Sequence, residues 1–203
     1  MFPYFKTLFD FSFSFLLFFL LFPLNIFIIL ILFFLSDSKV FFIHERIGKN
    51  GKKFNLYKFR TMKHSRDKIL DKYFQENPDQ KIYWQKNRKL KNDPRITKIG
   101  YLLREFSIDE LPQIFNILKG DMSFIGPRPI VEEELHKYGS KISDYKSVKP
   151  GLSGLWQVSG RNNTTYHDRV LLDCLYISKM SFSLDLKIFF KTIYVVFSRK
   201  GAY

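Results

Sequence analysis

Residues 15–35 read FLLFFLLFPLNIFIILILFFL, an apolar run of 21 residues that is interrupted only by Pro23 and Asn25. A straight helix of this length would rise about 32 Å at ~1.5 Å per residue, close to the ~30 Å thickness of the hydrocarbon core of a bilayer. No small-residue cleavage site follows the run, which disfavours a cleaved signal peptide. The sequence therefore predicts a helix that stays in a membrane.

Two topologies are compatible with this run. Pro23 lies near its middle, where a proline removes a backbone hydrogen bond and kinks a helix, and Asn25 adds a polar group that lipid does not satisfy. Positive side chains mark the cytoplasmic end of a membrane segment, and here they flank both ends: Lys6 before the run, and Lys39, Arg46, Lys49, Lys52 and Lys53 after it. The residues alone leave a spanning helix and a broken, re-entrant helix equally open.

The net charge of the chain lies entirely outside this segment. Residues 1–35 carry one lysine and one aspartate, so the formal charge of +14 belongs to residues 36–203. A hydrophobic share of 46% argues against a disordered chain, and a single cysteine excludes an internal disulfide. We therefore expect a membrane helix at 1–38 and one basic domain at 39–203, whose charge suits lipid headgroups, nucleic acid or phosphorylated substrates.

The pattern of the basic domain predicts an α+β fold that is mainly helical. Apolar and aromatic runs on either side of Gly48-Lys49-Asn50-Gly51 indicate a small β-hairpin. Apolar residues at helical spacing predict helices at 67–90, 99–106, 109–118, 166–178 and 184–199. Three prolines and five glycines between residues 126 and 160 favour loop there. The last helix is amphipathic and basic, which suits equally a core helix and one that lies in the membrane interface.

Two adjacent carboxylates occur in Ser107-Ile108-Asp109-Glu110-Leu111-Pro112. The simpler interpretation is a helix start, because Ser107 and Glu110 match the S-x-x-E capping box. Pro112 opposes that register, since it would be the fifth helical residue; a later cap, at residue 108 or 109, puts Pro112 in the first turn. Both carboxylates then stand at the positive end of a helix, where one could attack phosphorus and the other could hold Mg²⁺. The spacing alone favours capping.

Two arginines are placed where a phosphate could approach. Arg128 lies between Pro127 and Pro129, which stiffen its backbone, and its forked guanidinium can grip two phosphate oxygens. Arg161 follows Gly160, where a backbone can approach a ligand closely. A rigid turn with a solvated arginine is the simpler interpretation of each. The four histidines show no metal-ligand spacing, and no glycine-rich ATP or dinucleotide loop is present.

Taken together, the motifs resemble those of the bacterial sugar transferase family, the monotopic phosphoglycosyl transferases, over nearly the whole chain. They are LFD at 8–10, YKFRTM at 57–62, NDPRITKIG at 92–100, SIDELPQ at 107–113, NILKGDMS at 116–123, GPRP at 126–129, KPG at 149–151, GLWQV at 154–158 and SGRN at 159–162. NNTTY at 162–166 and RKGAY at 199–203 are most similar to members that load galactose phosphate. The chain is expected to correspond to the catalytic core of such members.

The resemblance implies an enzyme that transfers a sugar 1-phosphate from a UDP-sugar to undecaprenyl phosphate and releases UMP, the first membrane step of polysaccharide assembly. In such enzymes the aspartate of an Asp-Glu pair attacks the β-phosphorus and forms a covalent phosphosugar intermediate. Asp109 matches this nucleophile, and Glu110 matches its Mg²⁺-holding neighbour. The implied substrate contacts are arginines of the matching motifs: Arg60, Arg95, Arg128 and Arg161.

The resemblance also implies where the protein works. Members enter the bacterial cytoplasmic membrane by a helix broken at Ser-Pro, with both ends and the catalytic domain on the cytoplasmic face, in contact with membrane lipids. Pro23 matches that proline, whereas Phe22 replaces the usual serine, whose hydroxyl can bond backbone carbonyls freed by the kink. With this resemblance, the re-entrant topology becomes the expected one.

Alternatives stay open for the sugar that is transferred and for the functional class of the protein. Galactose is the first expectation for the sugar, with glucose or an N-acetylated sugar behind it, and the sequence predicts no oligomeric state. The rival classes are an inactive membrane scaffold and a membrane-tethered nucleic-acid-binding protein. A nucleic-acid-binding role would leave the Asp109-Glu110 pair and the prolines around Arg128 without a purpose, so no nucleic-acid partner is expected.

Overall fold

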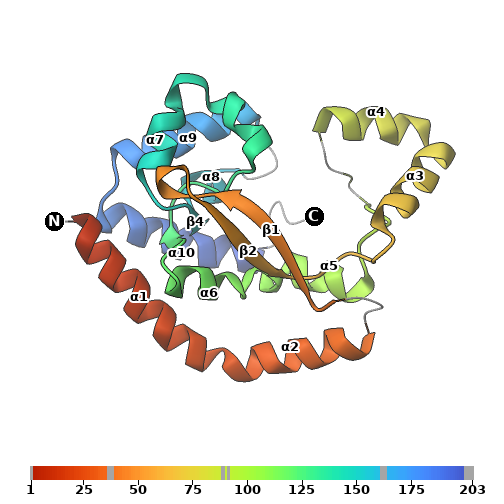
Figure 1. Ribbon diagram of the computed structural model, residues 1–203, viewed down its shortest axis with the longest axis horizontal. Coiled ribbons are helices and arrows are strands. Elements are labelled where there is room, and N and C mark those ends of the chain that lie inside the picture. Colours follow the sequence, from red (N-terminus) through yellow and green to blue (C-terminus); the bar gives the residue numbers. More distant parts are fainter. Residues whose placement is uncertain (1, 36–38, 88–89, 91, 161–163, 199–203) are drawn as a thin grey trace.

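The computed structural model describes residues 2–35, 39–87, 90, 92–160 and 164–198. Two consecutive helices, α1 (Phe2–Leu20) and α2 (Phe22–Leu35), run along one side of the molecule (Figure 1). In chain order, with η for a short 3₁₀ helix, the other elements are β1 (Phe41–Ile47), η1 (Lys49–Gly51), β2 (Lys53–Phe59), α3 (Arg66–Glu76), α4 (Pro78–Asn87), α5 (Lys98–Glu105), η2 (Ile108–Glu110), α6 (Gln113–Leu118), β3 (Ser123–Ile125), η3 (Glu132–Lys141), α7 (Ile142–Ser147), β4 (Gly151–Ser153), α8 (Leu155–Val158), α9 (Tyr166–Ser178) and α10 (Phe182–Ser198).

The apolar N-terminal run is broken, as its proline predicts. No single described helix has the length and apolarity to cross a bilayer, but α1 and α2 together do, and they are bent by 59° at their junction. Pro23 is the second residue of α2. The backbone N and side-chain Nδ2 of Asn25 both donate to the carbonyl of Leu21, at 2.9 and 2.8 Å. The Asn25 amide is thus satisfied inside the break, and the bend forms although Phe22 replaces serine.

Helix α1 is attached to the basic domain by buried polar contacts. Asp10 is 4% exposed, and its Oδ1 accepts a hydrogen bond from the backbone N–H of Phe124, 114 positions later. Lys6 Nζ pairs with Asp185 Oδ2 of α10 at 2.5 Å, across 179 positions. The ring of Phe13 packs on that of Phe124, with centroids 5.1 Å apart. These polar and aromatic contacts join the first helix to the basic domain. The predicted domain boundary at residue 38 stays a prediction.

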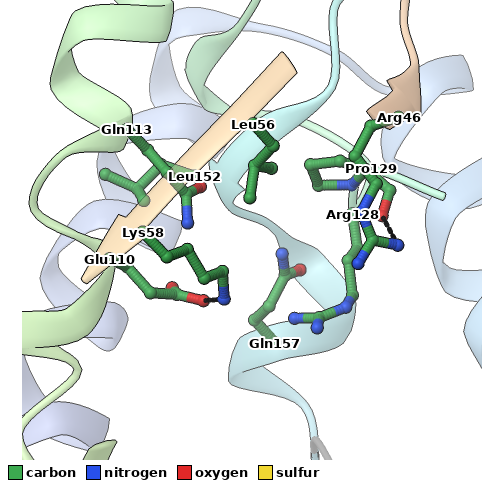
Figure 2. A pocket seen from close by; sticks show the side chains of 10 residues that line it. Arg46, Leu56, Lys58, Glu110, Gln113, Arg128, Pro129, Leu152 and Gln157 are labelled. Atoms are coloured by element: carbon green, nitrogen blue, oxygen red, sulfur yellow. Dashed lines mark hydrogen bonds and ion pairs between the residues drawn. The ribbon is translucent and has the colours of Figure 1, made fainter. Parts of the chain in front are cut away.

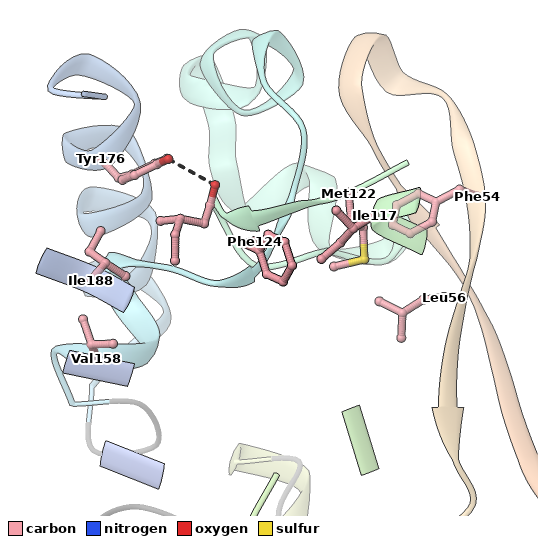
Figure 3. Close-up of a cluster of buried hydrophobic side chains, with 9 residues drawn as sticks. Phe54, Leu56, Ile117, Met122, Phe124, Val158, Tyr176 and Ile188 are labelled. Atoms are coloured by element: carbon pink, nitrogen blue, oxygen red, sulfur yellow. Dashed lines mark hydrogen bonds between the residues drawn. The ribbon is translucent and has the colours of Figure 1, made fainter. Parts of the chain in front are cut away.

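The predicted hairpin is confirmed and supplies one wall of the main core. β1 and β2 are antiparallel, with Phe41 opposite Phe59, and the turn between them places Asn50 and Gly51 at positive φ. Inward-facing residues of β2 meet side chains from α6, β3, α8, α9 and α10 (Figure 3): Phe54, Leu56, Ile117, Met122, Phe124, Val158, Tyr176 and Ile188. The mainly helical α+β class is confirmed.

Two predictions about the remaining elements are wrong. The helix expected over 67–90 is split into α3 and α4, which form an arm at one side of the molecule (Figure 1), because Pro78 starts a new helix after Asn77. The expected loop between residues 126 and 160 contains η3, α7, β4 and α8. Its prolines lie between these short elements rather than inside them, so they do not prevent helical turns.

The amphipathic last helix has one face in the core and another that is exposed, so its core role is confirmed and a place in the membrane interface stays a prediction. Ile188 of α10 is 2% exposed and lies in the main core, whereas Phe190, Tyr194 and Phe197 are 61%, 62% and 75% exposed. The helices predicted over 99–106, 166–178 and 184–199 are confirmed as α5, α9 and α10.

Candidate active site

The adjacent carboxylates lie in a turn of their own, before α6. Ser107 has a left-handed backbone with φ of 55°, and its side chain makes no capping hydrogen bond. The 3₁₀ turn η2 follows and holds Asp109 and Glu110, while Pro112 is the N-cap of α6. The capping box is therefore absent, and the helix predicted over 109–118 ends at Leu118 as predicted but starts only at Gln113. Because proline fits a helix only at its start, Pro112 delays α6 and leaves the two carboxylates outside it.

Asp109 is the more enclosed of the two carboxylates, at 8% exposed. Burial raises the pKa of its carboxyl group, the positive charge of Lys58 opposes this rise, and the neighbouring Glu110 adds to it, which leaves a pKa of about 6. A carboxyl group whose pKa is shifted by burial and by specific charges is typical of a functional site.

Lys58 is held opposite Glu110 by a bridge between β2 and α6. The side chain of Asn116, which is fully buried, accepts a hydrogen bond from the backbone N–H of Tyr57 at 3.1 Å and donates to the carbonyl of Asn55 at 2.7 Å. These bonds fix the strand against the helix. Lys58 Nζ then lies 2.5 Å from Oε1 of Glu110, and both side chains are about a quarter exposed.

A pocket opens between this ion pair and Arg128. It encloses about 270 Å³, counting its open mouth. Figure 2 shows Lys58 and Glu110 on one side, Arg128 and Arg46 on the other, and the side chain of Gln157 between them. The full lining is Arg46, Leu56, Lys58, Glu110, Gln113, Arg128, Pro129, Gly151, Leu152 and Gln157.

The loop that carries Arg128 is fixed on both sides. On one side, the backbone N–H of Gly151 donates to the carbonyl of Pro127 at 2.8 Å, next to the parallel pair β3–β4. The two backbones approach so closely that a Cβ on Gly151 would come within 2.1 Å of the nitrogen of Gly126. On the other side, the carbonyl of Ile130 accepts from the backbone N–H of Ile47 at 2.9 Å. Arg128 is therefore presented to the pocket by a rigid segment.

The other predicted arginines are placed differently. Arg95 donates to both carboxylate oxygens of Asp93, from Nε at 2.8 Å and from Nη2 at 2.6 Å. Arg60 donates to the carbonyl of Phe41 at 3.3 Å. Neither residue lines the pocket, so their contact with substrate stays a prediction. Arg161 lies outside the described residues.

Three pocket residues were missed by the sequence analysis: Lys58, Arg46 and Gln157. A signal for Lys58 was present, because it shares a face of β2 with the buried Phe54 and Leu56 at the two-residue period of a strand. A lysine at an inward-facing position indicates a buried acidic partner. Arg46 and Gln157 gave no such signal.

The pocket lining contains one carboxylate, Glu110, that could hold a magnesium ion together with substrate phosphates. Among the residues that the structure describes, no group of three or more His, Cys, Asp and Glu side chains could enclose a metal. Mg²⁺ is usually bound through one or two carboxylates together with substrate phosphates. Glu110 offers such a carboxylate at the pocket wall, and Asp109 lies beside it.

Comparisons with known proteins agree with one another. A family model described as "Bacterial sugar transferase" matches residues 2–199. The chain is 47% identical over 181 residues to the exopolysaccharide production protein ExoY of Rhizobium meliloti, covering 89% of this chain and 80% of that protein.

Two further relatives are named for their reactions. The chain is 49% identical over 160 residues to an undecaprenyl-phosphate galactose phosphotransferase of Salmonella typhimurium, covering 79% of this chain and 34% of that protein. It is 40% identical over 176 residues to a UDP-glucose:undecaprenyl-phosphate glucose-1-phosphate transferase of Klebsiella pneumoniae, covering 83% and 35%. The chain thus spans about a third of the length of several curated relatives that it matches.

Proposed function

Because the chain belongs to the bacterial sugar transferase family, we propose that it transfers a sugar 1-phosphate from a UDP-sugar to undecaprenyl phosphate and releases UMP. The observation that carries the proposal is the pocket in which Glu110, next to the buried Asp109, faces Arg128. Glu110 lines this pocket and Asp109 does not; in the proposal Asp109, its neighbour in the chain, supplies the nucleophile, and Arg128 supplies positive charge for phosphate oxygens. The family name and the names of the relatives support the same reaction class.

The proposed reaction proceeds in two displacements at one phosphorus atom. A carboxylate oxygen of Asp109 attacks the β-phosphorus of the UDP-sugar; the new O–P bond forms as the bond to the UMP oxygen breaks, and UMP leaves with that electron pair. A phosphate oxygen of undecaprenyl phosphate then attacks the same phosphorus and frees the carboxylate. Because UMP leaves before the lipid arrives, one small pocket serves both substrates.

The charged residues of the pocket have distinct parts in this proposal. Lys58 holds Glu110 in place, and its positive charge lowers the free-energy cost of keeping the adjacent carboxylates of Asp109 and Glu110 ionised. Arg128 receives the diphosphate oxygens of the donor through its guanidinium fork. Glu110 would hold Mg²⁺, which when bound neutralises negative charge on the phosphates.

We further propose that α1 and α2 form a re-entrant membrane helix and that the basic domain lies on the cytoplasmic face of the bacterial membrane. The 59° bend supports this topology. A broad set of apolar side chains, each at least 40% exposed, supports contact with lipid: Leu8, Phe11, Phe15, Phe19, Phe27, Phe33 and Phe34 of α1 and α2, and Phe182, Leu186, Phe190, Ile193 and Phe197 of α10.

Cysteine labelling tests the topology. The chain has one cysteine, so a Cys174→Ser protein can receive a single new cysteine at Tyr4 or at Lys52, both exposed positions on opposite sides of the apolar run. A membrane-impermeant maleimide should label both variants in inside-out vesicles and neither in intact spheroplasts. Labelling of Tyr4→Cys in spheroplasts, with Lys52→Cys protected, would show a spanning helix instead. Detergent-lysed cells, in which both should react, are the control.

The reaction itself is tested by UMP release from purified, detergent-solubilised protein. We expect release with undecaprenyl phosphate, Mg²⁺ and one member of a panel of UDP-sugars, with UDP-galactose first and UDP-glucose and UDP-N-acetylated sugars behind it. A chelator should abolish release, and added Mg²⁺ should restore it. Silence across the panel in a folded preparation would contradict the proposal and favour an inactive scaffold.

A further inference from the structure

We propose that Arg169 and Asp173 of α9 are positioning residues for Arg128, and that they set both its backbone and the plane of its guanidinium. Neither residue lines the pocket, so neither is placed to contact substrate. The proposal rests on the proposed function in one respect, which is that Arg128 receives the diphosphate of the donor.

Helix α9 holds the backbone carbonyl of Arg128 and places a buried carboxylate near this residue. The carboxylate of Asp173 is fully buried near Arg128; burial raises the pKa of this carboxyl group to about 6, while Tyr138, Arg169 and Arg128 oppose the rise. Nη2 of Arg169 donates to the carbonyl of Arg128 at 3.5 Å. The hydroxyl of Tyr138 donates to Oδ2 of Asp173 at 2.7 Å and so fixes the carboxylate. The backbone at Arg128 is thereby tied to a helix that begins 38 positions later, at Tyr166.

A stack of flat side chains orients the guanidinium of Arg128. Its Cζ lies 5.7 Å from the ring centroid of Trp156, and Cζ of Arg169 lies 5.0 Å from the same ring and 5.0 Å from that of Tyr166. Nε1 of Trp156 donates to Oγ1 of Thr164 at 2.7 Å, which fixes the indole plane. Cation–π contacts are stronger in such partly buried places than at exposed ones, because the cation is partly desolvated.

The charges explain why Arg128, and not Arg169, is left for a ligand. Arg169 is 6% exposed and lies between two carboxylates, with Nη1 3.6 Å from Oε1 of Glu134 and Nε 3.8 Å from Oδ2 of Asp173. Nη1 of Arg46 lies 4.0 Å from Oε2 of Glu134. Burial and the charge of Arg128 lower the pKa of Arg46 to about 10. Three arginines thus share two carboxylates, and the surplus positive charge faces the pocket through Arg128 and Arg46, which both line it.

Trp156 provides a direct readout of this arrangement. The chain has two tryptophans, so a Trp84→Phe protein reports on Trp156 alone. We expect UDP, which carries the diphosphate without the sugar, to change the Trp156 emission on binding. Arg169→Lys keeps the charge but loses the flat stack and the bond to the Arg128 carbonyl, and should weaken UDP binding about 10-fold. Arg66→Lys, which breaks a 5.8 Å contact with Phe42 elsewhere, is the matched control and should bind UDP unchanged.

A double-mutant cycle separates positioning from an independent role. If Arg169 acts through Arg128, Arg169→Lys should cost little further affinity once Arg128 is already lysine. Additive losses, or an unchanged affinity in Arg169→Lys alone, would overturn the proposal. Should Arg169→Lys fail to fold, Tyr138→Phe, which removes only the hydroxyl on Asp173, completes the same cycle with a smaller expected loss of about 3-fold.

This design keeps the two proposals distinguishable. The titration measures UDP binding and needs no turnover, so a cycle that is non-additive in a protein that releases no UMP would support the positioning and contradict the reaction. UMP release by the parent protein together with an additive cycle would support the reaction and contradict the positioning role of Arg169 and Asp173.

Discussion

Replacing Asp109 by asparagine is expected to abolish sugar-phosphate transfer while the protein stays folded and membrane-bound. The amide keeps the shape of the carboxylate in its buried turn but is a poor nucleophile for phosphorus. Removing the nucleophile of a covalent mechanism costs on the order of 10⁴-fold or more in rate. UMP release measures the loss, and mass spectrometry of the intact protein after incubation with donor alone should show a phosphosugar adduct on the parent and none on the variant.

The matched control is Asp67→Asn, because the Asp67 side chain is 84% exposed in α3 and should tolerate the change with normal turnover. Two results would count against a nucleophilic Asp109. One is near-normal UMP release by Asp109→Asn. The other is an adduct of unchanged yield in that variant, which would move the covalent bond to another residue.

Replacing Lys58 by methionine is expected to cost about 10²–10³-fold in turnover, the usual scale for removing one electrostatic contact from a reacting centre. Methionine fills similar space without charge, so Glu110 loses its 2.5 Å partner. Two adjacent carboxylates would then face an incoming diphosphate with less positive charge nearby. The loss should appear in kcat as well as in kcat/KM for the UDP-sugar, both measured by UMP release at varied donor concentration.

Lys53→Met is the control for this prediction. Lys53 lies on the same strand and also pairs with carboxylates, Glu45 at 3.1 Å and Glu132 at 2.5 Å, but these pairs are exposed and exposed ion pairs contribute little. Its turnover should stay within a few-fold of the parent. Equal losses in Lys53→Met and Lys58→Met would point to a general effect of charge on the basic domain and against a local role for Lys58.

Local patterns predicted the features that depend on local physics. The apolar run with Pro23 predicted a broken helix, and the Asn-Gly turn predicted the hairpin, because each follows from backbone preferences of neighbouring residues. The helices with clear apolar spacing were found for the same reason. The split at Pro78 shows where apolar spacing fails as a predictor. The helical spacing of apolar residues continues past Pro78, but the proline ends one helix and starts another.

The site was predicted only in part, because its members are brought together by long-range contacts. Lys58 meets Glu110 because Asn116 ties β2 to α6, and no local pattern encodes that bridge. The turn at Asp109 required a left-handed Ser107, which a capping motif does not suggest. The segment after Arg128 was assigned to loop because glycine and proline are frequent there, yet close backbone packing at Gly126 and Gly151 uses those residues to build structure.

The contacts of α1 set an order of events during synthesis. Lys6 and Asp10 are translated first, but their partners Phe124 and Asp185 follow 114 and 179 positions later. At synthesis rates of ~5–20 residues per second, the first helix waits roughly 6–36 s for them. During that interval a carboxylate that ends up 4% exposed has none of its final partners, so Asp10 is expected to stay in contact with water until the ribosome has finished. A version shortened at the N-terminus would meet the opposite difficulty, since its last-made helix would find no lysine to pair with Asp185.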